Sequence, residues 1–182
     1  MVSEYLLANY AKFPHRQAVP LGKIDEKLQA QVGYQTAIGY SRPYRPEVDA
    51  IVILPGALVL LEGKVWNVIN GLSKLRPYKS LVPFTPEFKA YNIGYWEYAA
   101  GLTPIYTPHY IDLTQREVLL ELVVGQTNDN LEMMARNEGV TVRLYNPPWL
   151  ADVVAKMHNY WTADYQRERQ RILEQRKLFG LE

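Results

Sequence analysis

The sequence predicts a single α/β domain, 1–182, with a mixed β-sheet, on the evidence of three segments. Two apolar runs rich in β-branched residues flank a Pro-Gly pair at 55–56, which is typical of a β-hairpin. The stretch that follows has apolar residues at three- and four-residue intervals, which predicts a helix. Farther along, a strand, a short helix, a glycine and another strand favour a parallel βαβ unit.

The segments before the hairpin give weaker signals. Apolar spacing predicts a first helix over 4–13, with Ser3 as its N-cap. The short apolar run 18–24 predicts the first strand. Asp25 opens either a loop or a short helix, and 31–40 is either strand or loop.

The remaining elements follow from the same periodicities: hairpin strands over 47–54 and 57–65, a helix over 66–78, a strand over 117–124, a helix over 128–138 and a strand over 140–145. The stretch 83–112 is rich in Pro, Gly and aromatic residues and is predicted to be an insertion outside the core. Its tyrosines either pack on one another or stack on bases. A long C-terminal helix is predicted over 148–179, with an apolar stripe that should dock on the core: Leu150, Val154, Met157 and Trp161.

Composition excludes several kinds of protein. With 20 basic and 19 acidic residues, any nucleic-acid contact must be a local patch. The absence of cysteine excludes disulfides, thiol catalysis and cysteine-ligated zinc. No run approaches the ~18 apolar residues of a membrane span, and the N-terminus does not have the pattern of a signal peptide. We therefore expect an intracellular, cytoplasmic protein without a membrane partner.

The hairpin brings two carboxylates together. If the Pro-Gly pair forms the loop, Asp49 lies opposite Glu62, and Glu47 lies opposite Lys64. Opposite residues have Cβ atoms about 5 Å apart, so the two carboxylates repel each other unless a positive charge lies between them. A divalent cation fits that position, and Lys64 shares the same face. A three-residue loop or a bulge would shift the register by one and remove this direct opposition. The alternative interpretation is a half-buried hairpin with a solvated polar face, on which Glu47–Lys64 is a surface ion pair of little energetic weight.

The order of elements, together with Asp49 and Glu62-Gly-Lys64, resembles the PD-(D/E)XK nuclease superfamily with its restriction-endonuclease-like fold. The resemblance covers about residues 1–80 and 117–147 and implies an αβββαβαβ order, with 83–112 inserted. RecB-type nucleases carry a Gln four residues before a Tyr on the helix after the hairpin. Here the Tyr is kept as Tyr78, but Lys74 occupies the Gln position.

The resemblance implies a Mg²⁺- or Mn²⁺-dependent nuclease acting on DNA. Asp49, Glu62 and Lys64 would be the catalytic residues. Asp49, Glu62 and the carbonyl of Gly63 would hold the metal, which lowers the pKa of a bound water. Lys64 would position that water or stabilise the phosphate.

Four further residues are candidates for accessory roles at this site. In the superfamily a Glu from the first helix often completes the site, which suggests Glu4, and Glu47 is a rival for the same role. Lys74 and Tyr78 would face the site and contact phosphate.

Two other accounts stay open. In one, the chain is a non-catalytic protein of the nuclease fold, a nucleic-acid-binding or assembly component of a phage or mobile element. In the other, it is an unrelated α/β domain with a coincidental hairpin. Endonucleases and exonucleases, acting on DNA or on RNA, use the same core, so the core does not distinguish these activities. Beside DNA, a second copy or a protein partner could bind through the helix over 148–179 or the insertion over 83–112.

Overall fold

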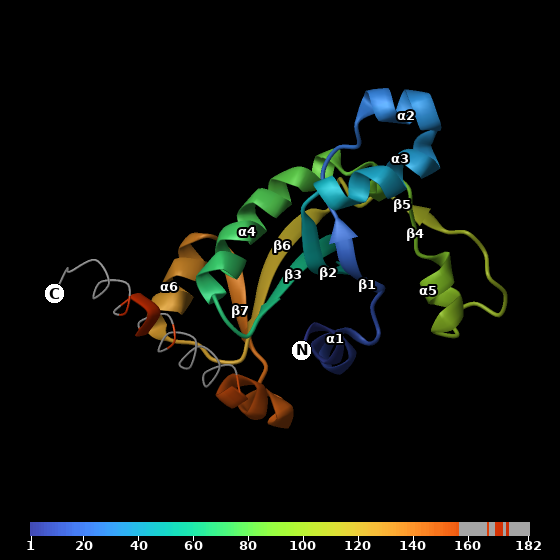
Figure 1. The fold of residues 1–182 in the computed structure, drawn as a ribbon. Helices are drawn as coiled ribbons and strands as arrows, with labels where there is room; N and C mark the ends of the chain where they lie inside the picture. The colour runs from blue at the N-terminus through green and yellow to red at the C-terminus, as the bar shows by residue number, and fades with distance from the viewer. Residues whose placement is uncertain (157–166, 168–169, 173, 175–182) are drawn as a thin grey trace. The chain divides into compact units, whose positions relative to one another are not determined.

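The computed structural model describes residues 1–156, 167, 170–172 and 174 (Figure 1). The chain forms two compact units, Met1–Tyr145 and Asn146–Glu182, and each is described by itself. The first unit contains a five-stranded mixed sheet flanked by helices, so the predicted α/β class is confirmed. Among the described residues, no helix combines the length and the apolar character that a membrane crossing needs.

The first unit contains these elements in chain order: α1 (Val2–Tyr10), β1 (His15–Pro20), α2 (Glu26–Val32), α3 (Tyr34–Ser41), η1 (Arg42–Tyr44), β2 (Glu47–Leu54), β3 (Ala57–Lys64), α4 (Val68–Leu81), η2 (Val82–Phe84), η3 (Pro86–Phe88), β4 (Tyr91–Asn92), α5 (Gly94–Ala99), β5 (Tyr110–Ile111), β6 (Glu117–Val124), α6 (Asp129–Asn137) and β7 (Val140–Leu144). The main sheet has the strand order β1-β2-β3-β6-β7. Its first three strands are antiparallel, and β3, β6 and β7 are parallel.

Helices cover both faces of the sheet, as Figure 1 shows for α4 on one side and α1 on the other. Leu60 of β3 packs with Leu75 of α4 and Leu131 of α6 in the larger core cluster. Leu61, the next residue of β3, packs with Leu6 of α1 in the second cluster. Consecutive residues of a strand point to opposite faces, so one strand supplies both layers of the core.

The hairpin register is confirmed over most of its length. Leu54 pairs with Ala57, and the ladder runs inward to Ala50 opposite Leu61. Beyond that point the two strands keep other partners. The pairing of β1 with β2 continues to Glu47, and the pairing of β3 with β6 continues to Lys64. The described ladder between β2 and β3 therefore ends one residue short of Asp49 and Glu62.

The predicted bounds of the first helix and of the first strand are wrong. The first helix is Val2–Tyr10 rather than 4–13, and its N-cap is Met1 rather than Ser3. The first strand is His15–Pro20 rather than 18–24, because its limits are set by pairing with β2. The buried apolar residues Leu21 and Ile24 lie beyond its end.

The segment 31–40 is helical, not strand or loop. Asp25 is the N-cap of α2, and its carboxylate accepts hydrogen bonds from the backbone N–H groups of Lys27 and Leu28. Gly33 ends α2 at φ +82° and leads into α3. A positive φ at this position suits glycine, so two short helices form where a single strand was an option.

The helix after the hairpin begins at Val68 rather than at 66 and ends at Leu81 rather than at 78. It runs to Leu81 although Pro77 lies inside it. Proline in a helix interior removes a hydrogen bond at a cost of about 3 kcal/mol. Leu75 and Tyr78 on either side of Pro77 are both buried in the core, and this packing offsets the cost.

The predicted insertion, 83–112, forms short 3-10 turns, α5 and a separate two-stranded sheet of β4 and β5. Its first part is anchored in the core through Phe88, which is 1% exposed. In the second unit, residues 148–156 are helical, as are 167, 170–172 and 174. Met157 and Trp161 of the predicted apolar stripe lie outside the described residues.

A buried ion pair ties the insertion to the loop before β2. The guanidinium of Arg45, whose side chain is 4% exposed, donates to both carboxylate oxygens of Glu87 at 2.6 and 2.8 Å. It also donates to the backbone carbonyls of Leu21 and Pro20. Bidentate pairs of this kind fix geometry as well as charge. Glu87, part of a second Glu-x-Lys sequence with Phe88 and Lys89, therefore has a structural role.

We predict that Glu87→Ala lowers the free energy of unfolding by about 2–4 kcal/mol, because it leaves the buried Arg45 charge without its carboxylate. Glu138→Ala is the matched control. It removes an exposed pair with Arg76 at 3.0 Å, which is worth less than about 1 kcal/mol. Urea denaturation of both variants measures the difference, and equal losses would contradict the prediction.

Tyrosine hydroxyls on α1 give the domain a pH dependence. Tyr5 and Tyr10 both donate to the carboxylate of Glu121 on β6, Tyr10 at 2.7 Å. Burial, followed by the bond to Glu121, raises the pKa of Tyr10 to about 12 from its ordinary value of 10.0. The unfolded chain therefore loses this proton first as the pH rises. The contribution to stability is fully present below pH 10 and is lost between pH 10 and 12.

We predict that wild-type protein loses stability between pH 10 and 12 more steeply than Tyr10→Phe, which has no hydroxyl to titrate. Urea midpoints at pH 8, 10 and 11.5 measure both slopes. Parallel curves for the two proteins would show that Tyr10 keeps an ordinary pKa.

Candidate functional site

The candidate site lies where β2 and β3 cease to pair. Asp49 comes from β2 and Glu62 from β3, each immediately beyond the last rung, Ala50–Leu61. The Oδ2 atom of Asp49 accepts a hydrogen bond from the backbone N–H of Gly63 at 2.9 Å. A side chain thus connects the strands where the backbone ladder stops, and it holds the Asp49 carboxylate at the residue that follows Glu62.

Glu62 is a buried charge. Its side chain is 1% exposed, and its Oε1 atom lies 2.8 Å from the Nζ of Lys64 and 3.7 Å from the Nζ of Lys74. Burying a carboxylate is costly unless cations and hydrogen bonds compensate it. The two ammonium groups supply that compensation at one oxygen only.

The other oxygen, Oε2 of Glu62, is buried without a hydrogen-bond partner among the described residues. An unpartnered buried acceptor costs about 1–3 kcal/mol, and more when it is charged. Such an atom is stabilised by a ligand that carries positive charge or a proton. A divalent cation fits, because carboxylate oxygens are its preferred ligands.

Helix α4 covers this point with two side chains on one face, four residues apart. Lys74 reaches Glu62 as described above. Tyr78 is buried, and its pKa is raised by burial first and then by the negative charges of Glu62, Asp49 and Glu47. The phenol therefore stays protonated and lies within the field of all three carboxylates. The expected orientation of Lys74 and Tyr78 toward the pair of acids agrees with these interactions.

Glycines make room for the charged side chains. A Cβ at Gly63 would collide with the side chain of Val2 on α1, so the strand and this helix pack closely there. A Cβ at Gly71 of α4 would lie 2.6 Å from Cγ of Lys64 and 3.0 Å from a methyl of Leu122. The lysine stem therefore passes directly over Gly71.

Gly71 is a residue that the sequence reasoning missed. A glycine inside an amphipathic helix costs about 1 kcal/mol relative to alanine, so its presence there was a usable signal of close packing.

The two other acidic candidates are placed differently. Glu47 does not face Lys64 as expected: it accepts a hydrogen bond from Arg42 at 3.1 Å, while Lys64 pairs with Glu62. Glu4 is exposed on α1. The part of the chain that the structure describes contains no group of three or more Asp, Glu or His side chains able to hold a metal. Asp49 and Glu62 are thus a pair, to which a backbone carbonyl such as that of Gly63 would have to add.

Comparisons with protein-family models, with curated proteins and with solved structures find no match to this chain. Membership of the PD-(D/E)XK superfamily stays a prediction that rests on the residues described above.

We predict that Gly71→Ala lowers the free energy of unfolding by about 1–3 kcal/mol, because the added methyl collides with Lys64 and Leu122. Gly39→Ala on α3 is the control, since nothing lies within 4 Å of its added Cβ. That change should be neutral or stabilise by up to about 1 kcal/mol. Thermal and urea denaturation of the two variants would contradict the close approach if both behaved alike.

Proposed function

We propose that this protein is a metal-dependent nuclease that hydrolyses phosphodiester bonds of DNA. The observation that carries the proposal is the buried Glu62, with one oxygen paired to Lys64 and the other without a partner among the described residues, beside the break where Asp49 binds the N–H of Gly63. The order of elements supports it: apart from the helices α2 and α3 and the insertion with β4, α5 and β5, the chain runs α1, β1, β2, β3, α4, β6, α6 and β7, the order expected of a restriction-endonuclease-like core.

In this proposal Asp49, Glu62 and the carbonyl of Gly63 hold Mg²⁺ or Mn²⁺. The metal supplies an activated water and offsets phosphate charge. Lys64 places its ammonium beside the same carboxylate, where it orients the attacking water or stabilises the charge that develops on the phosphate. Lys74 and Tyr78 contact the phosphate from α4 as two donors, an ammonium and a protonated phenol.

The second candidate is a nuclease-fold protein without catalysis that binds nucleic acid or takes part in an assembly. One observation favours it: Lys64 and Lys74 already neutralise Glu62 without a metal, and among the described residues no third acidic side chain joins the pair. Measurements of cleavage and of metal binding separate the two candidates.

We predict Mg²⁺- or Mn²⁺-dependent cleavage of labelled single-stranded, linear or supercoiled DNA by the wild-type protein. Asp49→Asn, which keeps an acceptor for the Gly63 N–H, and Lys64→Ala should each lower the rate about 100-fold or more. Glu117→Gln, at the opposite end of the sheet, and the exposed Lys12→Ala are the matched controls and should cleave at the wild-type rate.

Metal binding has its own readout. Mn²⁺ should raise the melting temperature of the wild-type protein and of both controls, but not that of Asp49→Asn or Glu62→Gln. Circular dichroism establishes that each variant is folded. Absence of both cleavage and a Mn²⁺-dependent shift in folded wild-type protein would overturn the nuclease proposal and favour the non-catalytic role.

A further inference from the structure

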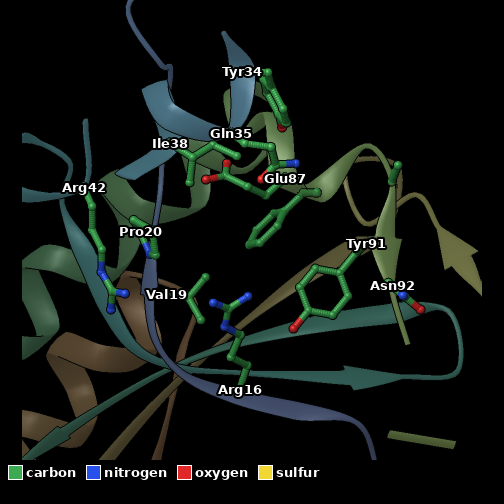
Figure 2. A pocket seen from close by; sticks show the side chains of 12 residues that line it. Arg16, Val19, Pro20, Tyr34, Gln35, Ile38, Arg42, Glu87, Tyr91 and Asn92 are labelled. Atoms are coloured by element: carbon green, nitrogen blue, oxygen red, sulfur yellow. The ribbon is translucent and has the colours of Figure 1, made fainter. Parts of the chain in front are cut away.

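A polar cavity lies at the edge of the sheet and does not include Asp49 or Glu62. It measures about 420 Å³ and is bounded by β1, α3 and the beginning of the insertion (Figure 2). Polar side chains line much of it: Arg16, Tyr34, Gln35, Arg42, Tyr91 and Asn92. Val19, Ile38 and Phe88 form an apolar wall. Its volume falls within the range of ~300–1,000 Å³ found for ligand pockets, which combine apolar walls with a few polar groups.

Arg16 is the cation of this cavity that is not committed to a carboxylate. Figure 2 shows it pointing from β1 into the space between Val19 and Tyr91. Its positive charge opposes the rise in the pKa of the Tyr91 hydroxyl, and among the described residues it forms no ion pair. By contrast, Arg42 is held by Glu47 and by the carbonyl of Ala18. An exposed guanidinium with free donors binds carboxylate or phosphate oxygens in a bidentate manner.

The cavity has one acid, and its charge is already neutralised. Glu87 lines the wall, but both of its oxygens accept from Arg45. Gln35 of α3 faces the cavity with an amide that can donate, and Tyr34 lies beside it (Figure 2). Burial raises the pKa of both Tyr34 and Tyr91, so their hydroxyls remain donors at neutral pH. The cavity therefore presents a positive, donor-rich surface suited to an anion.

Strand β1, which lines the cavity, pairs with β2, the strand that carries Asp49 of the proposed cleavage site. Pro20 and Val19, which line the cavity, pair with Glu47 and Val48, and Asp49 is the next residue. Arg42 lines the cavity and reaches Glu47 directly. A strand whose phosphate lies at Asp49 would thus have its neighbouring nucleotides close to this edge of the sheet.

We propose that this cavity binds one nucleotide of the substrate, with its phosphate on Arg16 and its flat base against the side chain of Ile38. A phosphate would pair with the guanidinium of Arg16, which has no carboxylate partner among the described residues. A base fits an apolar wall that is bordered by hydroxyl and amide groups. The assignment to a nucleotide rests on the proposed nuclease function. The nucleotide could come from a strand or be a free mononucleotide, and the two sources share this chemistry.

The test measures binding in EDTA, where no cleavage occurs. Fluorescence anisotropy of a labelled ten-nucleotide DNA strand and calorimetry with a nucleoside 5′-monophosphate report the two sources, with inorganic phosphate as a third titrant. Proteins compared are wild type, Arg16→Gln and Gln35→Glu, both at exposed positions, and Arg76→Gln as a control on the exposed surface of α4. Melting temperatures establish that each variant is folded.

Arg16→Gln and Gln35→Glu should each weaken binding of the strand, the mononucleotide or both by about tenfold or more, because they remove a charge-assisted bond or add a repelling charge. Arg76→Gln should bind as wild type does. Loss confined to the strand identifies a strand as the source, and loss with the mononucleotide identifies a free nucleotide. Equal affinity of all four proteins would overturn the proposal, as would inorganic phosphate binding as tightly as the mononucleotide.

This result is independent of the cleavage test. If the protein binds the nucleotide through Arg16 but does not cleave DNA, the proposed nucleotide pocket stands and the proposed nuclease function is overturned. Cleavage that depends on Asp49, together with binding that does not depend on Arg16, would do the reverse.

Discussion

The separation of β2 from β3 beyond Ala50 and Leu61 is the constraint on which the rest of the site depends. Each strand continues its ladder with a different neighbour, β2 with β1 and β3 with β6. Backbone groups freed at such a break must find other partners. The carboxylate of Asp49 accepts from the N–H of Gly63 and so satisfies one of them. A polar side chain at this position therefore serves the fold and is available for chemistry.

Glu62 occupies the same break at a high electrostatic cost. A carboxylate that is 1% exposed is retained only where positive charge is close, and Lys64 and Lys74 supply it from a strand and from a helix. Gly71 makes this possible, because any larger residue on α4 would displace the stem of Lys64. Glu62, Lys64, Gly71 and Lys74 thus form one unit, in which the packing of α4 on β3 determines where the charged groups lie.

Segments outside the main sheet provide a separate polar surface. The helical segment between β1 and β2 and the start of the insertion meet at the cavity that contains Arg16, and the buried Arg45–Glu87 pair holds them together. This arrangement explains how a chain with a net charge of +1 can present a positive site. Arg45 and Arg42 are paired with carboxylates, whereas Arg16 is not. The positive charge at the cavity is therefore local and does not depend on the net charge of the chain.

By itself, the sequence determined the elements whose signals are local. The two apolar runs around Pro55-Gly56 determined the hairpin and its register, because the length of each run and the turn residues between them are local features. The spacing of apolar residues after residue 117 determined β6, α6 and β7. It also identified Asp49, Glu62 and Lys64 as residues of one neighbourhood. Tertiary structure decided the limits of β1, the end of the β2–β3 ladder and the role of Gly71. Each of these depends on contacts between residues distant in the sequence, whose energies exceed local propensity and which no short segment encodes. The helices over 26–41 form at local signals instead, the N-cap at Asp25 and the positive φ at Gly33.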